Sequence, residues 1–324
     1  MFRVLAFLLL ALAWGPRPQA QESTAPFSFV ALGDMPYDAP GDDRKFERLI
    51  AAINRERPAF SLHVGDFKSG ASACDDATFL KMLDWFNDFE QPLIYTMGDN
   101  EWTDCHRPRA GGFDPLERLA RLRQLFFKTP GVSLGRARIA LSPQGGNGGP
   151  FDPYVENARF EKSGVVFATV HVVGSNNGFT PANRAAANEF FERDAANAAW
   201  IDAAFRRAAD IGAAAVVLAW QADVMNPVQR LFGLPDASAY RATIAAVARN
   251  ARAFGKPVLI VHGDTHVFEV MPFLDVTRKP VGGVLRLQVM GEAYVHAVRV
   301  HVDPATAAVF SFEPLIVPGN LPIP

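Results

Sequence analysis

The chain has 324 residues, 49% of them hydrophobic, and a formal net charge of -2. This length suits one large α/β domain or two smaller ones, and the hydrophobic share excludes wholesale disorder. The near-neutral charge gives no electrostatic reason to expect nucleic acid or an anionic membrane as a partner.

The first residues have the pattern of a secretory signal peptide. A short positive start precedes the apolar residues 4–14, a run too short to span a bilayer comfortably, and Ala20 offers a cleavage position. Pro18 departs from the preference for a small residue three positions before the cut, and an uncleaved anchor is the alternative. We expect residues 1–20 to be removed on export, leaving residues 21–324 as a single periplasmic or secreted domain.

Strand-like and helix-like segments alternate along the rest of the chain. We expect strands at residues 27–32, 60–64, 92–97, 165–173, 213–219 and 257–261, and helices at residues 42–57, 76–89, 115–127, 183–209 and 237–254. The strands are short apolar runs, which are typical of a parallel sheet buried on both faces. Their alternation with helices predicts an α/β fold with right-handed crossovers.

Two further regions have a different pattern. Residues 135–153 are rich in Gly and Pro and predict a long loop. Polar and apolar residues alternate at 284–287, 297–302 and 308–312, which predicts half-exposed antiparallel strands. The chain is therefore expected to contain a mixed sheet, or two packed sheets, with helices outside.

Four acidic motifs each follow a predicted strand. The motifs are Gly33-Asp34-Met35-Pro36, Gly65-Asp66-Phe67-Lys68, Gly98-Asp99-Asn100-Glu101 and His262-Gly263-Asp264-Thr265-His266. Because ligand sites in open α/β sheets form beyond the carboxyl ends of strands, we expect these side chains to converge. Crowded carboxylates repel one another and usually need a cation. The sequence therefore predicts a metal site, with metal-assisted hydrolysis as its expected use.

The order of these motifs resembles that of the calcineurin-like metallophosphoesterases, over about residues 27–302. The family motifs are D-x-H, G-D-x-x, G-N-H-[DE], a later His and G-H-x-H. The resemblance implies a central two-sheet β-sandwich flanked by helices in four layers, with a two-metal site at the strand ends. It also implies that Asp34 and His266 are metal ligands and that Asp66 bridges the metals. Asp99 and Asp264 stand where the family has an Asn and a His ligand.

Several of the family's imidazoles are missing. Pro36 replaces a ligand His, and Asn100 replaces the catalytic His, while Glu101 matches the closing acid. The later His is absent after residues 213–219, where Gln221 or Asp223 could supply an oxygen ligand. Carboxylate-rich sites suit Mn²⁺, Mg²⁺ or Ca²⁺ better than zinc or iron. We therefore expect divalent ions of this harder class as cofactors, two of them by the resemblance.

Other histidines are candidates for supporting roles. Asn100 can donate a hydrogen bond to a phosphate oxygen but cannot act as a general acid, and His106 or His63 could replace the lost imidazole. A lone His is more often a surface or core residue. His262 is expected to shape the last motif's loop, and His171 is a candidate for the rim of the site.

The two cysteines, Cys74 and Cys105, each follow an acidic motif at short range. If the motifs converge, the two thiols lie near each other, and an oxidising compartment permits a disulfide. Two free thiols or a thiolate metal pair are the alternatives, although the lack of C-x-x-C spacing argues against structural zinc. We favour the disulfide.

These features together predict an exported, metal-dependent phosphoesterase that acts on a small phosphomonoester or phosphodiester. The alternative is a non-catalytic metal- or anion-binding protein on the same fold, because the ligand and general-acid histidines are missing. A third reading is a structural cell-envelope protein with a bare acidic pocket. The sequence does not identify the substrate.

Overall fold

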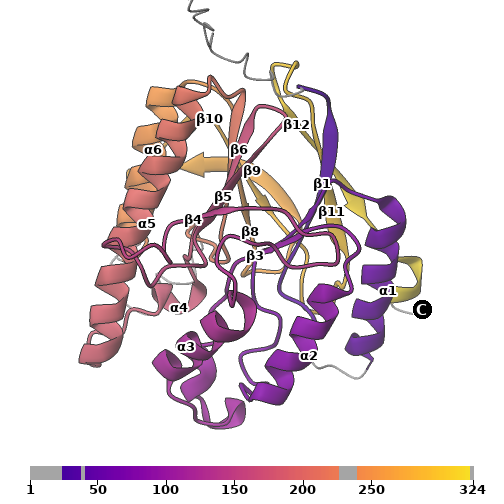
Figure 1. Ribbon diagram of the computed structural model, residues 1–324, viewed down its shortest axis with the longest axis vertical. Coiled ribbons are helices and arrows are strands. Elements are labelled where there is room, and N and C mark those ends of the chain that lie inside the picture. The colour runs from indigo at the N-terminus through magenta and orange to yellow at the C-terminus, as the bar shows by residue number, and fades with distance from the viewer. Residues whose placement is uncertain (1–23, 38–40, 226–238, 322–324) are drawn as a thin grey trace, which may run out of the picture.

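In the computed structural model, two β-sheets pack face to face between two layers of helices (Figure 1). The structure describes residues 24–37, 41–225 and 239–321. The predicted signal peptide, residues 1–20, lies outside these ranges. Within them, none of the helices combines the length and the apolar character needed to cross a membrane.

The first sheet has five strands in the order β12-β11-β1-β2-β3. Its strands are β1 (Phe27–Leu32), β2 (Ser61–His63), β3 (Leu93–Tyr95), β11 (Ala297–Val302) and β12 (Phe310–Leu315). Strands β1, β2 and β3 are parallel, with Leu62 opposite both Ala31 and Ile94, and β11 and β12 extend the sheet in antiparallel fashion. The first three acidic motifs therefore leave the sheet at one edge.

The second sheet has seven strands in the order β4-β5-β6-β7-β8-β10-β9. Its strands are β4 (Ser142–Pro143), β5 (Ala158–Lys162), β6 (Val165–Thr169), β7 (Ala215–Ala219), β8 (Val258–His262), β9 (Glu269–Leu274) and β10 (Pro280–Gln288). Strands β6, β7, β8 and β10 are parallel, so the antiparallel pairing expected for residues 284–287 holds only against β9. Strands β5 and β9 were not predicted from the sequence, and the two-residue strand β4 lies within the loop expected at residues 135–153.

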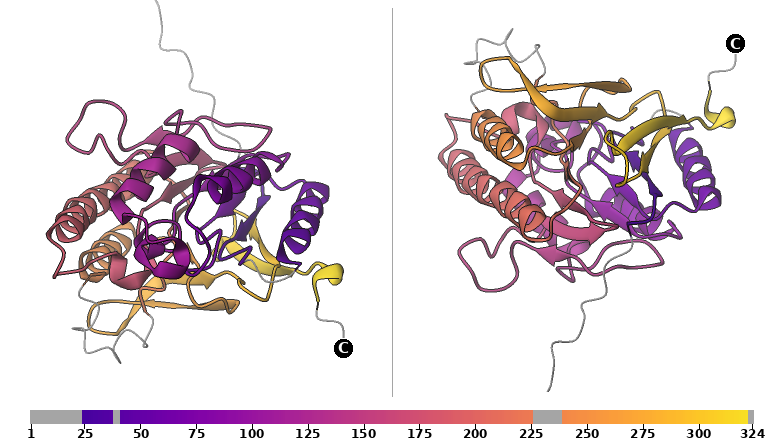
Figure 2. Two further views of the ribbon diagram at one scale, coloured as in Figure 1. Left: turned by 90° about the horizontal axis from the view of Figure 1, so that it is seen from below. Right: turned by 90° about the horizontal axis from the view of Figure 1, so that it is seen from above.

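The helices form the two outer layers. One layer contains α1 (Asp42–Glu56), α2 (Asp76–Asn87) and α3 (Pro115–Phe126), and the other contains α5 (Arg184–Asp210) and α6 (Arg241–Phe254). Figure 2 shows these layers on opposite sides of the strands. Side chains of Asp75, Asp114 and Asn183 accept backbone N–H bonds at the first turns of α2, α3 and α5, so ordinary N-cap chemistry starts these helices.

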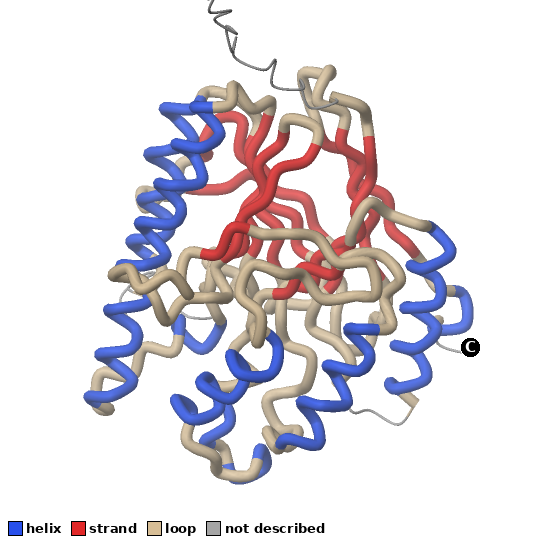
Figure 3. The backbone as a smooth tube through the Cα atoms, in the orientation of Figure 1, coloured by secondary structure: helices blue, strands red, loops and turns tan. Residues whose placement is uncertain are grey.

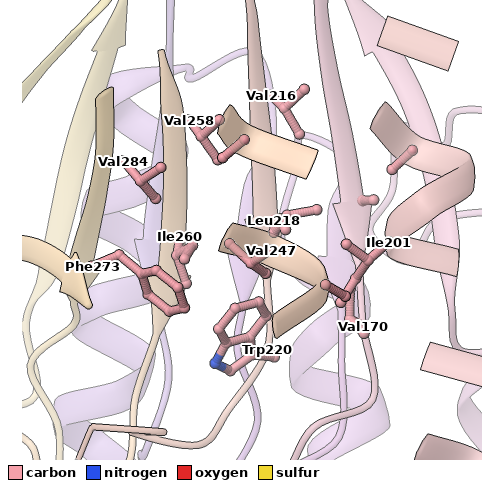
Figure 4. Close-up of a cluster of buried hydrophobic side chains, with 14 of the residues drawn as sticks. Val170, Ile201, Val216, Leu218, Trp220, Val247, Val258, Ile260, Phe273 and Val284 are labelled. Atoms are coloured by element: carbon pink, nitrogen blue, oxygen red, sulfur yellow. The ribbon is translucent and has the colours of Figure 1, made fainter. Parts of the chain in front are cut away.

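The strands alternate between two apolar layers. In β1, Phe29 and Ala31 face the space between the sheets, whereas Val30 and Leu32 pack toward α1 and α2. In the second sheet, Leu218 and Ile260 face α5 and α6, where they meet Trp220 (Figure 4). The central parallel strands β2, β3, β6, β7 and β8 therefore bury both faces, which explains why the sequence has unbroken apolar runs there.

This architecture confirms the predicted class, a two-sheet sandwich flanked by helices in four layers. The carboxyl ends of β1, β2, β3, β7 and β8 lie at one end of the sandwich. Loops gather there between the strands and helices α2 and α3 (Figure 3). The fold thus brings together chain segments that are far apart in the sequence.

Candidate metal centre

Four aspartates occupy the turns that follow four strands at this end of the sandwich. Asp34 follows β1, Asp66 follows β2, Asp99 follows β3 and Asp264 follows β8. Asp34 is fully buried, and Asp66 and Asp99 are 3% and 6% exposed. Asp34, Asp66 and Asp264 have φ angles of 53°, 53° and 84°, in the left-handed region that Asp tolerates better than most residues. Such turns let the chain leave each strand sharply and direct the carboxylate inward.

Glycines on neighbouring loops make room for these carboxylates. A Cβ added at Gly98 would overlap the carboxylate of Asp66, and one added at Gly263 would overlap that of Asp34. A Cβ at Gly174 would come within 2.7 Å of Asp99 Oδ1. The glycine of one Gly-Asp motif therefore leaves the space that the aspartate of another motif occupies.

Asp66 lies at the centre of the hydrogen-bond network. Its Oδ1 accepts from the backbone N–H of Asn100 at 3.0 Å. Its Oδ2 accepts from Nδ2 of Asn100 at 2.9 Å, from Nε2 of Gln221 at 3.1 Å and from the hydroxyl of Tyr37 at 3.3 Å. Segments following β1, β2, β3 and β7 therefore meet at one carboxylate.

His266 approaches this group from the last motif. Its Nδ1 lies 3.2 Å from Glu292 Oε2, and with Nδ1 donating to that carboxylate, Nε2 presents its lone pair to the site. Nε2 lies 3.2 Å from the Tyr37 hydroxyl and 3.8 Å from Asp34 Oδ1. Asp34 Oδ1 also accepts from the backbone N–H of Asp264 at 3.0 Å. The structure thus brings the predicted ligands of the first and last motifs together.

A second group of polar side chains surrounds Asp99. The hydroxyl of Ser175 lies 2.7 Å from Asp99 Oδ2 and 3.0 Å from Asp104 Oδ1. Asp104 also forms an ion pair with Arg107 at 2.7 Å. Ser175 belongs to the short turn α4 (Gly174–Asn177), where its φ is 48°. Neither Ser175 nor Tyr37 was predicted from the sequence to lie in the site, although Ser175 stands in the Gly/Asn segment 174–177.

Burial sets the protonation of these acids. Burial raises the pKa of Asp34 and Asp66 well above the usual range, and neighbouring carboxylates raise both pKa values further. Burial likewise raises the pKa of Asp99 and Glu101. For Asp264, burial and the charge of Asp99 raise the pKa to about 7. A bound cation would reverse this tendency, because it favours the ionised carboxylates.

Glu101 and His262 support the loops. Glu101 Oε1 accepts from the hydroxyl of Tyr95 at 3.1 Å and from the backbone N–H groups of Gly98 and Phe67 at 3.3 and 3.4 Å. Glu101 therefore ties the second motif to the third. His262, the first residue of the last motif, is buried, and its Nδ1 lies 3.0 Å from the carbonyl oxygen of the adjacent Gly263.

The remaining predicted histidines lie elsewhere. His171 is fully buried, with Nδ1 2.8 Å from Glu156, and therefore does not line a rim. His106 is exposed, and its Nδ1 lies 2.7 Å from the carbonyl of Thr103 in its own turn. His63 is fully buried in an aromatic core. The structure brings none of these three among the carboxylates described above.

The predicted disulfide is present. Cys74 and Cys105 are bonded, with their Cα atoms 5.7 Å apart. Cys105 lies in the 3-10 helix η1 (Thr103–His106), just after the third motif, and Cys74 lies in the loop after the second. The bond therefore connects the segment after Asp66 to the segment after Asp99.

The donor atoms at these strand ends are of the kind that hard divalent cations prefer. In the described part of the chain, no group of three or more His, Cys, Asp and Glu side chains is already arranged around a metal position. However, Oδ2 of Asp34 is buried and has no hydrogen-bond partner among the described residues. Carboxylate oxygens from Asp34, Asp66, Asp99 and Asp264 gather at these strand ends, and carboxylates are ligands that Mg²⁺, Mn²⁺ and Ca²⁺ prefer.

Solved structures similar to this chain include two phosphatases and a membrane-complex anchor. A dimetal phosphatase from Danio rerio matches with a TM-score of 0.55 at 12% identity, covering 90% of this chain and 99% of that one. GAP50, the anchor in the inner membrane complex of Plasmodium, matches with a TM-score of 0.47 at 14% identity, over 90% and 89% of the two chains. Purple acid phosphatase PPD1 from yellow lupin (Lupinus luteus) seeds matches with a TM-score of 0.46 at 10% identity, over 93% and 55%.

Sequence comparison adds nothing to these structural matches. Neither a protein-family model nor a curated protein matches the sequence. The similarity to the Danio rerio structure nevertheless establishes the fold. The chain has the calcineurin-like metallophosphoesterase fold that its motif order predicts.

Proposed function

We propose that this protein is a divalent-cation-dependent phosphoesterase that hydrolyses a small phosphomonoester or phosphodiester. The observation that carries this proposal is the convergence of acids from both sheets at the strand ends of a metallophosphoesterase fold. Asp34 Oδ1 lies 3.8 Å from Nε2 of His266 and accepts the N–H of Asp264, although β1 and β8 belong to different sheets.

Asp34, Asp66 and His266 would hold the cation, with Asp99 and Asp264 adding negative charge beside it. A bound divalent cation supplies Lewis-acid stabilisation of phosphoryl oxygens and lowers the pKa of water. The protein's own task is to fix these ligands and exclude bulk water. The tight glycine contacts of Asp34 and Asp66 fix the two carboxylates, and their burial excludes water.

We propose that Asn100 orients the substrate, which requires its amide to turn from the two acceptors that it contacts in the structure, Asp66 and Tyr37. Its Nδ2 lies 2.9 Å from Asp66 Oδ2, and its backbone N–H holds the other oxygen of the same carboxylate. An amide N–H can donate to a phosphate oxygen but cannot transfer a proton. We therefore expect esters with good leaving groups, which need little protonation, to be the better substrates.

Export belongs to the same proposal. Residues 1–20 have a signal-peptide pattern, and the Cys74–Cys105 disulfide is a feature of proteins in oxidising compartments. Both observations support a periplasmic or secreted protein.

A non-catalytic cation- or anion-binding protein is the second candidate. It is supported by the neutral donors of Asn100, Gln221 and Tyr37, which already satisfy Asp66 Oδ2 without a metal. Pro36, which has no donor atom, removes a further ligand. This candidate predicts stabilisation by a cation without turnover.

One experiment separates the two candidates. The mature protein, starting near Gln21, would be treated with a chelator and assayed on a chromogenic phosphomonoester and phosphodiester after separate addition of Mn²⁺, Mg²⁺, Ca²⁺ and Zn²⁺. Turnover restored by one ion supports the phosphoesterase. Cation binding measured on the same sample without turnover on either ester would favour the binding protein.

A further inference from the structure

We infer that the phenol oxygen of Tyr37 is a ligand of the cation and replaces the imidazole that the sequence lacks at Pro36. The inference rests on the proposed function in one respect only, because it requires that the protein binds a divalent cation. It concerns a residue outside the family's motif positions.

The positions of the donor atoms support this role. The Tyr37 oxygen lies 3.3 Å from Asp66 Oδ2 and 3.2 Å from His266 Nε2, and that nitrogen lies 3.8 Å from Asp34 Oδ1. Two ligands at right angles around Mg²⁺ or Ca²⁺, at about 2.1 or 2.4 Å from the ion, lie about 3.0–3.4 Å from each other. The spacings at Tyr37 are therefore those of neighbouring ligands in one coordination shell, and a small inward movement of His266 would complete the set.

A Tyr37 ligand would also account for the lack of three His, Cys, Asp or Glu side chains around one point in the described part of the chain. The Tyr37 oxygen occupies the place between Asp66 and His266 where a third donor would stand. A phenol is an oxygen donor, and Mg²⁺ and Ca²⁺ take oxygen ligands.

The backbone brings Tyr37 to this place. Pro36 follows Asp34 by two residues and has no donor atom, and the chain then turns so that the next side chain points back to the site. The Tyr37 ring packs edge-on against the His266 ring, with centroids 5.2 Å apart, and its hydroxyl accepts from Nδ2 of Asn100 at 3.2 Å. Together with its hydrogen bond to Asp66, these contacts hold the phenol in place before any cation binds.

A buried acceptor supplies an independent indication that a cation belongs here. Asp34 is fully buried, and within the described chain its Oδ2 has no hydrogen-bond partner. An unpaired buried carboxylate oxygen costs free energy unless a proton or a cation satisfies it. Its other oxygen is 3.8 Å from the His266 nitrogen that touches Tyr37.

The test compares Tyr37→Phe with wild type and with Tyr154→Phe, whose ring packs on Arg123 away from the carboxylates. Calorimetric titration with Mn²⁺, Mg²⁺, Ca²⁺ and Zn²⁺ gives the dissociation constants, and near-UV difference spectra report the tyrosines. We expect Y37F to weaken cation binding by about tenfold or more. The tyrosine spectrum of wild type and Y154F should change on cation addition, and that of Y37F should not.

Each other result contradicts the inference. Equal or tighter binding by Y37F would mean that the phenol only fills the site and competes with the cation, and the proposed function would survive. Failure of wild type to bind any of the four ions would overturn the proposed function and this inference together. If Y37F does not fold, the difference spectrum of wild type still decides, because an unchanged tyrosine spectrum at saturating cation excludes a phenol ligand.

Discussion

The hydroxyl of Tyr37 lies 3.2 Å from Nε2 of His266, although 229 positions separate the two residues in the chain. Tyr37 follows a strand of the five-stranded sheet, and His266 follows a strand of the seven-stranded sheet. The contact therefore forms only when the two sheets are correctly packed. The site therefore forms together with the packing of the two sheets. Substitutions that disturb this packing should also disturb the site.

Asp66→Asn should abolish turnover while leaving the fold intact. Asn tolerates the left-handed φ of 53° at this position, and the substitution removes one acid from a crowded group. We expect a loss of more than about 100-fold in cation-dependent turnover, because loss of a metal ligand should exceed the 10–100-fold typical of its supporting residues. The exposed Asp43→Asn, which breaks only the surface pair with Lys81, is the control. Equal turnover in the two variants would exclude the proposed site.

Gly263→Ala should disrupt the site through Asp34. The added Cβ would overlap the Asp34 carboxylate, which is buried and cannot move aside freely. We expect a loss of about 1–3 kcal/mol in the free energy of unfolding, the usual cost of overpacking, together with weaker cation binding.

Gly282→Ala is the matched control for this change. A Cβ at Gly282 meets no atom within 4 Å, so its stability should stay close to that of wild type or rise slightly. Urea unfolding of the two variants and of wild type measures the three free energies of unfolding. Similar stability of the two variants would mean that Asp34 is not held as tightly as the structure indicates.

Removing the disulfide should loosen the second and third motifs. Cys74 and Cys105 are 31 positions apart, and closing a loop of this size stabilises a protein by about 2–4 kcal/mol. The double variant Cys74→Ser with Cys105→Ser should lose about this much on unfolding and should bind the cation less tightly, because Asp66 and Asp99 flank the bonded loops. Unchanged stability, with the disulfide verified in wild type, would contradict this prediction.

His63 should make stability depend on pH. Burial lowers the pKa of His63 from 6.5 to about 3, so between these values the unfolded chain binds a proton that the folded chain does not. This contribution to stability is therefore complete above pH 6.5 and is lost as the pH falls toward 3. Burial raises the pKa of the buried acids, so their contribution to stability falls as the pH rises. The contribution of His63 must therefore be isolated by comparison with a variant.

His63→Asn provides that variant. Asn can still accept the backbone N–H of Gly65, which bonds Nδ1 of His63 at 3.2 Å, but it does not titrate. The advantage of wild type over the variant should shrink by on the order of 2 kcal/mol between pH 7 and pH 5. Urea unfolding of wild type and variant at pH 7 and at pH 5 measures this difference in stability. A constant difference across this range would show that His63 gains its proton as readily in the folded protein as in the unfolded one.

The sequence predicted the fold well because its strongest signals are local. β1 and β11 lie at the residues expected, since unbroken or alternating apolar runs determine burial directly. β9 was missed because its residues are mostly exposed, so no apolar pattern marks it. β5 was missed because its half-buried residues mix charges with aromatic side chains.

The site was predictable only in part. Asp34, Asp66 and Asp264 carry the Gly-Asp signal, and strand order alone places them at one end of the sandwich. Tyr37 and Ser175 carry no such signal, because their position depends on how a turn folds back after the motif. His171 shows the opposite error: it follows β6 by two residues and was predicted at the rim, but it lies in the interior beside Glu156.

The most direct test of the account is anomalous diffraction from a crystal of the mature protein grown with Mn²⁺. We predict an anomalous peak within coordination distance of Asp34, Asp66 and His266, with the Tyr37 oxygen in the same shell. A fully occupied peak elsewhere on the molecule, or none at a concentration that saturates binding in solution, would contradict a cation site at these strand ends.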